Sequence, residues 1–480
     1  MTGAGQAGLP LDGFSSAPDA AAAAPSATIA GRIAARIDRL PLTKVQWEIA
    51  ILVELTWGLI IVDTDGIAGR LYPFIWRPHH YVSTFQYSVI QALEVGLGVL
   101  IGDWIMSWVA DRYGRKIGIV LAAVLGGLFL WPFAYVTSFW QLVALSVFST
   151  LGVGAIVALH SVYISELIGP NARNRLLLSA QSVTALVGVV VGLLAFFWIP
   201  IHWQAYVWVV AALVLVMFPL LLWRLPESPR WLEAHGRHDE AERVVEKLEA
   251  RCQRAYGKEL PEPDPDMNPV VMAGKGAWKE LFINPEYRQR TILLLISWLL
   301  GYPGIVYGVG AFAAVYMVDH GASAHFVFLL ITIAGVFRFG GFLANARLGE
   351  RFERRDVILA VALLFFIGWG VIYFFPTKPV IAIFYVVAGI GGSLWLFNMY
   401  NYTAMAFPTR FRAVAFGWTD GLGHLGAWAG ITLTGPLYLM GQNHLGWVLF
   451  IIVPGALIPS LLVRFLGINQ RAAVMEQVST

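Results

Sequence analysis

Long runs of apolar residues alternate with short polar segments along most of this chain. A helix that crosses the roughly 30 Å hydrocarbon core of a bilayer needs about 20 mostly apolar residues, and it satisfies its own backbone hydrogen bonds in lipid. The pattern therefore predicts an all-α membrane protein with twelve transmembrane helices. The predicted spans are residues 46–68, 85–110, 117–136, 140–166, 176–199, 203–224, 289–316, 323–347, 357–376, 379–405, 413–439 and 445–467.

Lysine and arginine lie almost entirely on one side of this predicted bundle. When both termini are placed in the cytoplasm, 29 of the 33 basic residues fall on the cytoplasmic side. Cytoplasmic loops of membrane proteins are enriched in basic residues, so this distribution predicts cytoplasmic termini and an even number of spans. The four exceptions are Arg70, Arg77 and Lys378 in outer loops, and Arg338 within a span.

The two ends of the chain differ in composition from the spans. Residues 1–40 are rich in Ala, Gly, Pro and Ser. They lack the basic segment, the apolar core and the cleavage site of a signal peptide. We therefore predict a disordered cytoplasmic tail at residues 1–40, and a second, short cytoplasmic tail at residues 468–480.

One long polar segment, residues 225–288, divides the predicted spans into two sets of six. Within it, residues 236–251 have helical spacing, with Val244, Val245 and Leu248 on one side. We predict a cytoplasmic linker that contains a short helix. This linker joins an N-terminal half at residues 41–224 to a C-terminal half at residues 289–467.

Composition supports lipid as the solvent of most of the chain. Hydrophobic residues make up 58% of the 480 residues and charged residues only 13%, against about 25% charged residues in soluble domains. A net charge of +3 does not indicate a nucleic-acid partner. The single cysteine, Cys252, excludes an internal disulfide and a multi-cysteine metal site.

The sequence contains no motif of an enzyme. It lacks a phosphate-binding loop, a nucleophile motif and a cluster of metal ligands. We therefore predict neither catalysis nor ATP-driven pumping, and neither a cofactor nor a metal site.

The two halves contain related sequences. Residues 102–116 (GDWIMSWVADRYGRK) match residues 341–355 (GFLANARLGERFERR) at a constant offset of 239. Residues 152–163 (GVGAIVALHSVY) match residues 389–400 (GIGGSLWLFNMY) at an offset of 237. Such parallel repeats are typical of transporters, in which the substrate binds near the bilayer midplane between the halves.

Five segments resemble the motifs of a known family. They are ARIDRLPLTKVQW (35–47), DRYGRK (111–116), ELIGPNARNR (166–175), PESPRWL (226–232) and YTAMAFPTRFRA (402–413). Over residues 34–467 the chain resembles the major facilitator superfamily, in its sugar-porter-like group and the metabolite–proton symporter branch. The resemblance implies that family's fold and transport by alternating access between the two halves.

The chain departs from the family pattern at several positions. Ser107 replaces the usual leading glycine of the loop between helices 2 and 3. Met405 stands where the family usually has a glutamate at the end of helix 10, and His424 stands where it usually has an arginine in helix 11. The resemblance implies an ion pair between that glutamate and that arginine, so the loss of both implies a different conformational lock on this side of the membrane. The glutamine pair of sugar-selective members is absent from residues 297–317, which counts against a sugar substrate.

Charged residues at the predicted cytoplasmic helix ends have two interpretations. They are either a topology signal or a conformational latch, whose carboxylates and guanidinium groups pair in one state of the cycle. The repeat and the resemblance favour the latch, with Glu166 expected near Arg173 or Arg175 and Glu227 near Arg230. The candidates are Asp111, Arg112, Arg115, Lys116, Glu166, Arg173, Arg175, Glu227, Arg230, Glu350, Arg351 and Arg354.

Ionisable groups within spans are candidates for function, because each costs about 2.5–3.5 kcal/mol to insert. For proton coupling the candidates are Glu54, Asp63, Asp65, Asp420 and His424. The resemblance favours Asp63, whereas the deeper position of Glu54 in the predicted span favours Glu54. Asp63 and Asp65 could instead be solvated at the outer end of the span. Asp420 and His424 are four residues apart and predict a proton relay, or else a structural pair.

Arg338 is the only basic residue deep in a span. One interpretation is an ion pair with Glu94 or another buried acid; the other is bidentate recognition of a substrate carboxylate. Other candidates for substrate contact are His160, Gln181, Tyr302, Tyr307, Asn398 and Asn401. A lone histidine such as His160 is equally consistent with packing.

Together these features predict a secondary active transporter in the plasma membrane, such as a bacterial inner membrane. Its substrate is a small organic metabolite, an organic or aromatic acid, and it moves with protons. The alternatives are a sugar transporter or a transporter-like sensor. We predict a monomer whose partners are the substrate, protons and the lipid bilayer.

Overall fold

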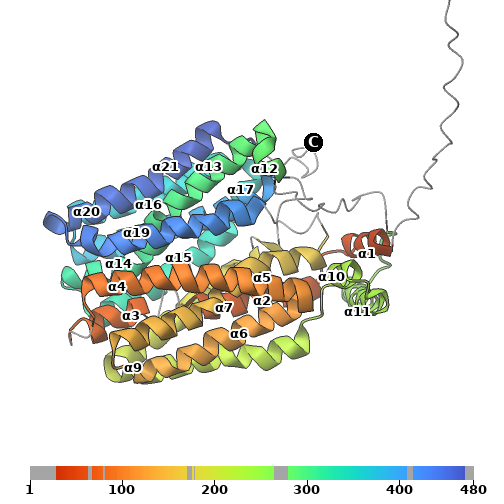
Figure 1. Ribbon diagram of the computed structural model, residues 1–480, viewed down its shortest axis with the longest axis horizontal. Helices are drawn as coiled ribbons and strands as arrows, with labels where there is room; N and C mark the ends of the chain where they lie inside the picture. Colours follow the sequence, from red (N-terminus) through yellow and green to blue (C-terminus); the bar gives the residue numbers. More distant parts are fainter. Residues whose placement is uncertain are drawn as a thin grey trace, which may run out of the picture.

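The computed structural model describes residues 29–62, 68–78, 82–169, 176–177, 179–263, 279–407 and 415–470. Every regular element in these ranges is helical. Two bundles lie along one another, one built from the N-terminal half and one from the C-terminal half (Figure 1). The predicted all-α fold is therefore confirmed for the described residues.

The N-terminal bundle consists of long apolar helices joined by short turns. Ser83 and Ser138 cap the helices that follow them, each accepting a hydrogen bond from a backbone N–H. The elements are α2 (Lys44–Val62), α3 (Ala68–Leu71), η2 (Tyr72–Trp76), α4 (Thr84–Leu93), η3 (Glu94–Val99), α5 (Leu100–Tyr113), α6 (Arg115–Leu130), η4 (Trp131–Tyr135), α7 (Phe139–Leu167) and α9 (Ser182–Arg224).

The C-terminal bundle repeats this organisation. Asn284 and Ser323 cap its first and third long helices. The elements are α12 (Glu280–Ile283), α13 (Pro285–Gly301), η6 (Tyr302–Val306), α14 (Tyr307–Asp319), α15 (Ala324–Arg351), α16 (Arg354–Phe374), α17 (Lys378–Met405), η8 (Gly417–Gly421), α19 (Leu422–Tyr438), η9 (Gln442–His444), α20 (Leu445–Trp447), η10 (Val448–Ile452) and α21 (Val453–Leu466).

Nine helical stretches of the described residues are long and apolar enough to cross a membrane. One of them, α9, contains residues 182–199 of the predicted span 176–199 and all of the predicted span 203–224. These two meet at His202, whose backbone is not helical (φ −153°, ψ 76°). The kink at this position divides the continuous run of 43 residues into two helices.

Small residues allow the two bundles to approach closely. A Cβ added at Gly192 of α9 would lie 2.5 Å from the Oγ1 of Thr332 in α15, and one at Gly335 would lie 2.8 Å from the Cγ2 of Val189. Helices in membranes associate through such close packing, because lipid tails are as apolar as the side chains that they contact. The α9–α15 contact is therefore a major seam between the halves.

A small cluster of helices, α1 (Ile29–Asp38), α10 (Pro229–Ala234) and α11 (His238–Tyr256), lies at one end of the N-terminal bundle (Figure 1). The helix predicted at 236–251 corresponds to α11. Its buried side chains share a core with α1 and α10, namely Ile33, Ile37, Trp231, Leu232, Ala241 and Val245. The prediction of disorder over residues 1–40 is therefore wrong for residues 29–38.

Ion pairs hold this cluster together, and a buried thiol connects it to α2 of the bundle. Arg36 and Arg39 both donate to the carboxylate of Glu249 in α11, at 2.6 Å and 2.5 Å. Burial disfavours the ionised form of Glu249, but these two hydrogen bonds outweigh it and lower the pKa of the carboxyl. The thiol of Cys252 is fully buried, with its Sγ 3.3 Å from the Nε2 of Gln46.

Candidate functional site

A buried carboxylate lies where α2 contacts α9. Glu54 has no exposed surface, and its Oε2 accepts a 3.5 Å hydrogen bond from the hydroxyl of Thr184. The other oxygen, Oε1, has no hydrogen-bond partner among the described residues. At Gly58, one turn further along α2, a Cβ would lie 3.2 Å from the Cα of Thr184, which shows how closely the two helices approach. The other two helix 1 candidates, Asp63 and Asp65, lie outside the described residues.

Aromatic rings connect this region to the opposite half. Trp57 packs on the imidazole of His160 with ring centroids 3.9 Å apart, and its edge meets Phe397 of α17 at 5.3 Å. His160 Nδ1 lies 3.1 Å from the carbonyl oxygen of Ile156. The indole nitrogen of Trp57 and the Oε1 of Gln181 have no hydrogen-bond partner in the described part of the chain.

A second buried carboxylate lies in the C-terminal half, within an aromatic cluster. Asp420 is 3% exposed, and its Oδ1 accepts a hydrogen bond from the hydroxyl of Tyr302. The hydroxyls of Tyr302 and Tyr400 are 3.2 Å apart. Tyr307 reaches the same cluster, with its hydroxyl 3.4 Å from the Nε2 of His424.

The predicted relay between Asp420 and His424 is wrong in its geometry. His424 Nδ1 lies 3.1 Å from the main-chain carbonyl of Asp420, not from its carboxylate. The π-helical turn Gly417–Gly421 widens the helix at Asp420. Side chains four residues apart then no longer face each other as in an α-helix, and the carboxylate turns to Tyr302.

Turns of π-helix coincide with buried polar groups at two other places. One begins at Glu94 and another at Tyr302. Such turns inside α-helices are frequent at functional sites. Their positions therefore support a functional role for the polar residues in the middle of the bundle.

Arg338 lies on the side of α15 that faces α17. A Cβ added at Gly389 of α17 would lie 3.9 Å from the Nε of Arg338. Its Nε donates to the carbonyl of Ala334 at 3.3 Å, and it forms no ion pair with the described residues. The interpretation in which Arg338 pairs with Glu94 is therefore wrong. Glu94 instead accepts a hydrogen bond from Gln91.

The two predicted asparagines have different environments. Asn398 donates to the Oδ1 of Asn345 at 3.0 Å and to the carbonyl of Leu394 at 2.8 Å. Asn401 has a buried Nδ2 with no hydrogen-bond partner among the described residues. Sequence reasoning missed Asn345, Thr184 and Tyr400, although Tyr400 is the last residue of the second repeat block.

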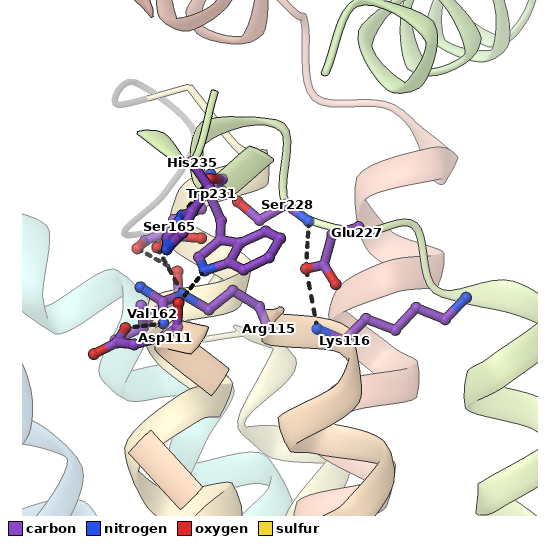
Figure 2. A network of polar contacts seen from close by, with 10 residues as sticks. Asp111, Arg115, Lys116, Val162, Ser165, Glu227, Ser228, Trp231 and His235 are labelled. Carbon is purple, nitrogen blue, oxygen red and sulfur yellow. Dashed lines mark hydrogen bonds and ion pairs between the residues drawn. The ribbon is translucent and has the colours of Figure 1, made fainter. Parts of the chain in front are cut away.

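The loop between α5 and α6 contains a network of ion pairs (Figure 2). Arg115 pairs with Asp111 and, at 3.3 Å, with Glu166 of α7. Trp231 of α10 donates its indole N–H to the carbonyl of Asp111 at 2.8 Å. In this structure these latch candidates bind one another within the N-terminal half and its linker.

Glu227 caps the start of α6. Its Oε1 accepts the backbone N–H of Lys116 at 3.1 Å and that of Ser228 at 2.9 Å (Figure 2). Burial raises the pKa of the Glu227 carboxyl, while these backbone hydrogen bonds oppose the shift. Its predicted pair with Arg230 is wrong, since Arg230 binds Asp38 of α1 at 2.5 Å.

The remaining latch candidates are not paired with an acid in the described residues. Arg112 is exposed and lies over the ring of Trp108; Arg351 is exposed too. Arg354 is 8% exposed, with a nitrogen 2.9 Å from the sulfur of Met405. Arg173 and Arg175 lie outside the described residues, as does the side chain of Glu350.

The end of the bundle remote from α1 and α11 joins the two halves by an ion pair. Arg77 lies 2.6 Å from Asp319 at the end of α14, and the hydroxyl of Tyr438 donates to the same carboxylate at 2.8 Å. Tyr87 also donates to the carbonyl of Ala311 across the seam, at 2.8 Å. Near α1 and α11, the ion pairs of Arg36, Arg39 and Arg115 stay within the N-terminal half and its linker. The contacts at the remote end hold the two halves together there.

We expect Arg77→Ala and Asp319→Ala to change the rate of substrate exchange by the same mechanism. Each variant removes the same ion pair between the halves, so the double variant should be no worse than Asp319→Ala, which also loses the hydrogen bond from Tyr438. A double-mutant cycle on exchange rates should give a coupling of up to about fivefold, since partly exposed pairs contribute up to about 1 kcal/mol. Additive effects would show that the pair does not connect the halves energetically.

Comparison with known proteins places this helical bundle in a family. The sequence profile of the Major Facilitator Superfamily matches residues 64–430. The chain belongs to this superfamily and is a multi-pass membrane transporter of the plasma membrane.

Its relatives include transporters of small molecules. The chain is 28% identical to the 4-hydroxybenzoate transporter PcaK of Pseudomonas aeruginosa, over 88% of this chain and 93% of the relative. It is 24% identical to the niacin transporter NiaP of Acinetobacter baylyi, over 93% and 99% of the two chains. The proton:xylose symporter XylE has the same fold, with a TM-score of 0.66 and 17% identity over 91% of this chain and 98% of that one.

Proposed function

We propose that this transporter moves an aromatic carboxylate together with protons by alternating access. The observation that supports this best is a set of unpaired charges in the middle of the bundle. Among the described residues, Glu54 and Asp420 have no cationic partner and Arg338 has no acidic one. An anionic substrate would neutralise Arg338, and protons would neutralise the two carboxylates.

The proposed substrate follows from Arg338 and its surroundings. A guanidinium group binds a carboxylate through two parallel hydrogen bonds, and one turn along α15 the ring of Phe342 contacts Phe397, which in turn contacts Trp57. The names of two relatives, 4-hydroxybenzoate and niacin transporters, denote aromatic carboxylic acids. A sugar remains the second candidate, because an arabinose–proton symporter of Escherichia coli is 32% identical over 51% of the chain.

Proton coupling in this proposal uses buried carboxylates. Glu54 and Asp420 lie in opposite halves, and each is buried without a cation in the described part of the chain. A buried carboxylate without a cationic partner loses its costly charge when it binds a proton, which favours the protonated form. Asp63 and Asp65 remain candidates through the family resemblance.

We propose that the charged residues of the cytoplasmic helix ends form a latch when that side closes. Arg115 would then exchange a partner within its own half for one in the other half. Arg354 supports this idea from the C-terminal half, since it is buried and, among the described residues, its polar contact is with the sulfur of Met405. An acid from the N-terminal half would satisfy it better than a thioether.

We also propose the complete architecture of the chain. It comprises twelve spans with both termini in the cytoplasm, halves at residues 41–224 and 289–467, a linker at 225–288 and a tail at 468–480. The chain acts as a monomer in a bacterial inner membrane.

Uptake into proteoliposomes tests the proposed function. Labelled 4-hydroxybenzoate, niacin, an aliphatic acid and xylose are offered with and without a pH gradient that is acid outside. We expect the aromatic acids to accumulate only with the gradient. Uptake of xylose without uptake of any acid would reverse the choice in favour of a sugar, and equal uptake without a gradient would exclude proton coupling.

A further inference from the structure

Three buried polar atoms lack a hydrogen-bond partner where α2 contacts α9, as judged from the described residues. They are the Oε1 of Glu54, the Nε1 of Trp57 and the Oε1 of Gln181. Their side chains are at most 3% exposed. Each unpaired buried atom costs about 1–3 kcal/mol, and folded proteins contain few of them. Three together point to a ligand that supplies the missing partners.

The three atoms lie on neighbouring turns of two touching helices. Glu54 and Trp57 are three residues apart on α2 and so lie side by side. Gln181 precedes α9 and is three residues from Thr184, whose hydroxyl lies 3.5 Å from the Oε2 of Glu54. His160 fixes the Trp57 ring from the other side. One small group of a ligand could therefore contact more than one of these atoms.

The chemistry of the three atoms selects the ligand group. The indole N–H only donates, whereas the amide oxygen and a carboxylate oxygen only accept. A hydroxyl has one hydrogen to donate and can also accept, so it can accept from the indole N–H and donate to one of the two oxygens. A second carboxylate would fit poorly, because it would be repelled by Glu54 and would lack a donor to Gln181.

Aromatic rings separate these atoms from Arg338. Trp57 meets the edge of Phe397 at 5.3 Å, and Phe397 meets Phe342 of α15 at 4.9 Å. Arg338 lies one helical turn before Phe342, on the same side of α15. A flat ring between the halves would thus have polar atoms of α2 and α9 at one end and a guanidinium at the other.

We propose that Glu54, Trp57 and Gln181 form a subsite for a ring hydroxyl of the substrate, with the substrate carboxylate at Arg338. The subsite rests on the proposed function, since it presumes an aromatic carboxylate. It adds an orientation and a preference: an acid with a hydroxyl opposite its carboxylate binds more tightly than the unsubstituted acid.

Calorimetric binding of 4-hydroxybenzoate and of benzoate to the full chain in proteoliposomes tests the subsite. The wild type should bind the hydroxylated acid about tenfold more tightly, as expected for one or two hydrogen bonds. Trp57→Phe keeps the ring and removes the N–H, and Gln181→Leu removes the acceptor. Each should reduce the preference, which is the ratio of the two affinities measured on the same variant, to about threefold or less, and thermal unfolding of each purified variant checks that it is folded.

Trp208→Phe is the matched control. Its indole nitrogen also lacks a partner among the described residues, but its ring packs near Trp131 and Tyr135, away from α2. This variant should keep the full preference.

Three outcomes would overturn the subsite. They are equal affinities of the wild type for the two acids, an undiminished preference in both variants, and a loss of benzoate binding that equals the loss of 4-hydroxybenzoate binding. All three leave the proposed function standing, because benzoate or 4-hydroxybenzoate still binds to the wild type. If the wild type binds neither acid but binds a sugar, the proposed function itself is wrong.

Discussion

Replacing Glu54 by Gln or Asp420 by Asn is expected to abolish accumulation of substrate driven by a pH gradient, while counterflow exchange continues. The amide mimics the protonated carboxyl and cannot release a proton. Both carboxylates are buried, and in the described part of the chain Glu54 has one hydroxyl as its partner and Asp420 has Tyr302. A permanently neutral group at either position therefore keeps the bundle intact but removes the step that uses the gradient.

Accumulation and exchange should be measured for each variant in the same proteoliposomes, with benzoate as the substrate. Benzoate has no hydroxyl, so the proposed contact between Glu54 and a ring hydroxyl does not affect the comparison. Glu48→Gln is the matched control, since Glu48 lies on the same helix but is exposed and pairs with Arg251. Normal accumulation in these variants and in Asp63→Asn, Asp65→Asn and His424→Gln would mean that these residues do not couple proton movement to transport.

Replacing Arg338 by Lys is expected to weaken binding of an aromatic carboxylate by about tenfold to a hundredfold. Lysine keeps the charge but loses the planar fork that donates two parallel hydrogen bonds, and charge-assisted hydrogen bonds contribute about 1.5–3 kcal/mol. In this structure the guanidinium has only the carbonyl of Ala334 as a partner among the described residues. The substitution therefore removes no ion pair from the protein itself.

Dissociation constants from calorimetry test this expectation. Arg112→Lys makes the same exchange at an exposed arginine that also lacks an acidic partner in the described part of the chain, and it should bind substrate like the wild type. An unchanged dissociation constant in Arg338→Lys would show that the substrate carboxylate binds elsewhere.

The helical architecture could be predicted from the sequence because lipid imposes long apolar stretches. The position of α1 could not be predicted, since its stability comes from contacts with residues 192 to 213 positions away. The Arg36–Glu249 hydrogen bond, for instance, joins residues 213 positions apart. An Ala-rich segment without a partner in view looks disordered, whereas the same segment on α10 and α11 buries Ile33 and Ile37.

Buried charges could be predicted for the same reason, because each is costly in lipid and so stands out. Their partners could not. An ideal helix places Asp420 beside His424, but the π-helical turn at Gly417–Gly421 redirects the carboxylate to Tyr302. Likewise, the proximity of Glu227 and Arg230 in sequence suggested a pair, whereas Glu227 caps α6 and Arg230 reaches α1.

Because Cys252 is buried, spin labels on introduced cysteines can follow the opening and closing of the two ends of the bundle during transport. It is the only cysteine in the chain, it lies under Gln46, and burial raises the pKa of its thiol, so that little of the reactive thiolate forms. Spin labels attached to cysteines introduced in pairs, one in each half, would therefore report distances without background from the native thiol. Pairs near Asp319 and pairs near Arg115 should change in opposite directions as substrate and protons bind.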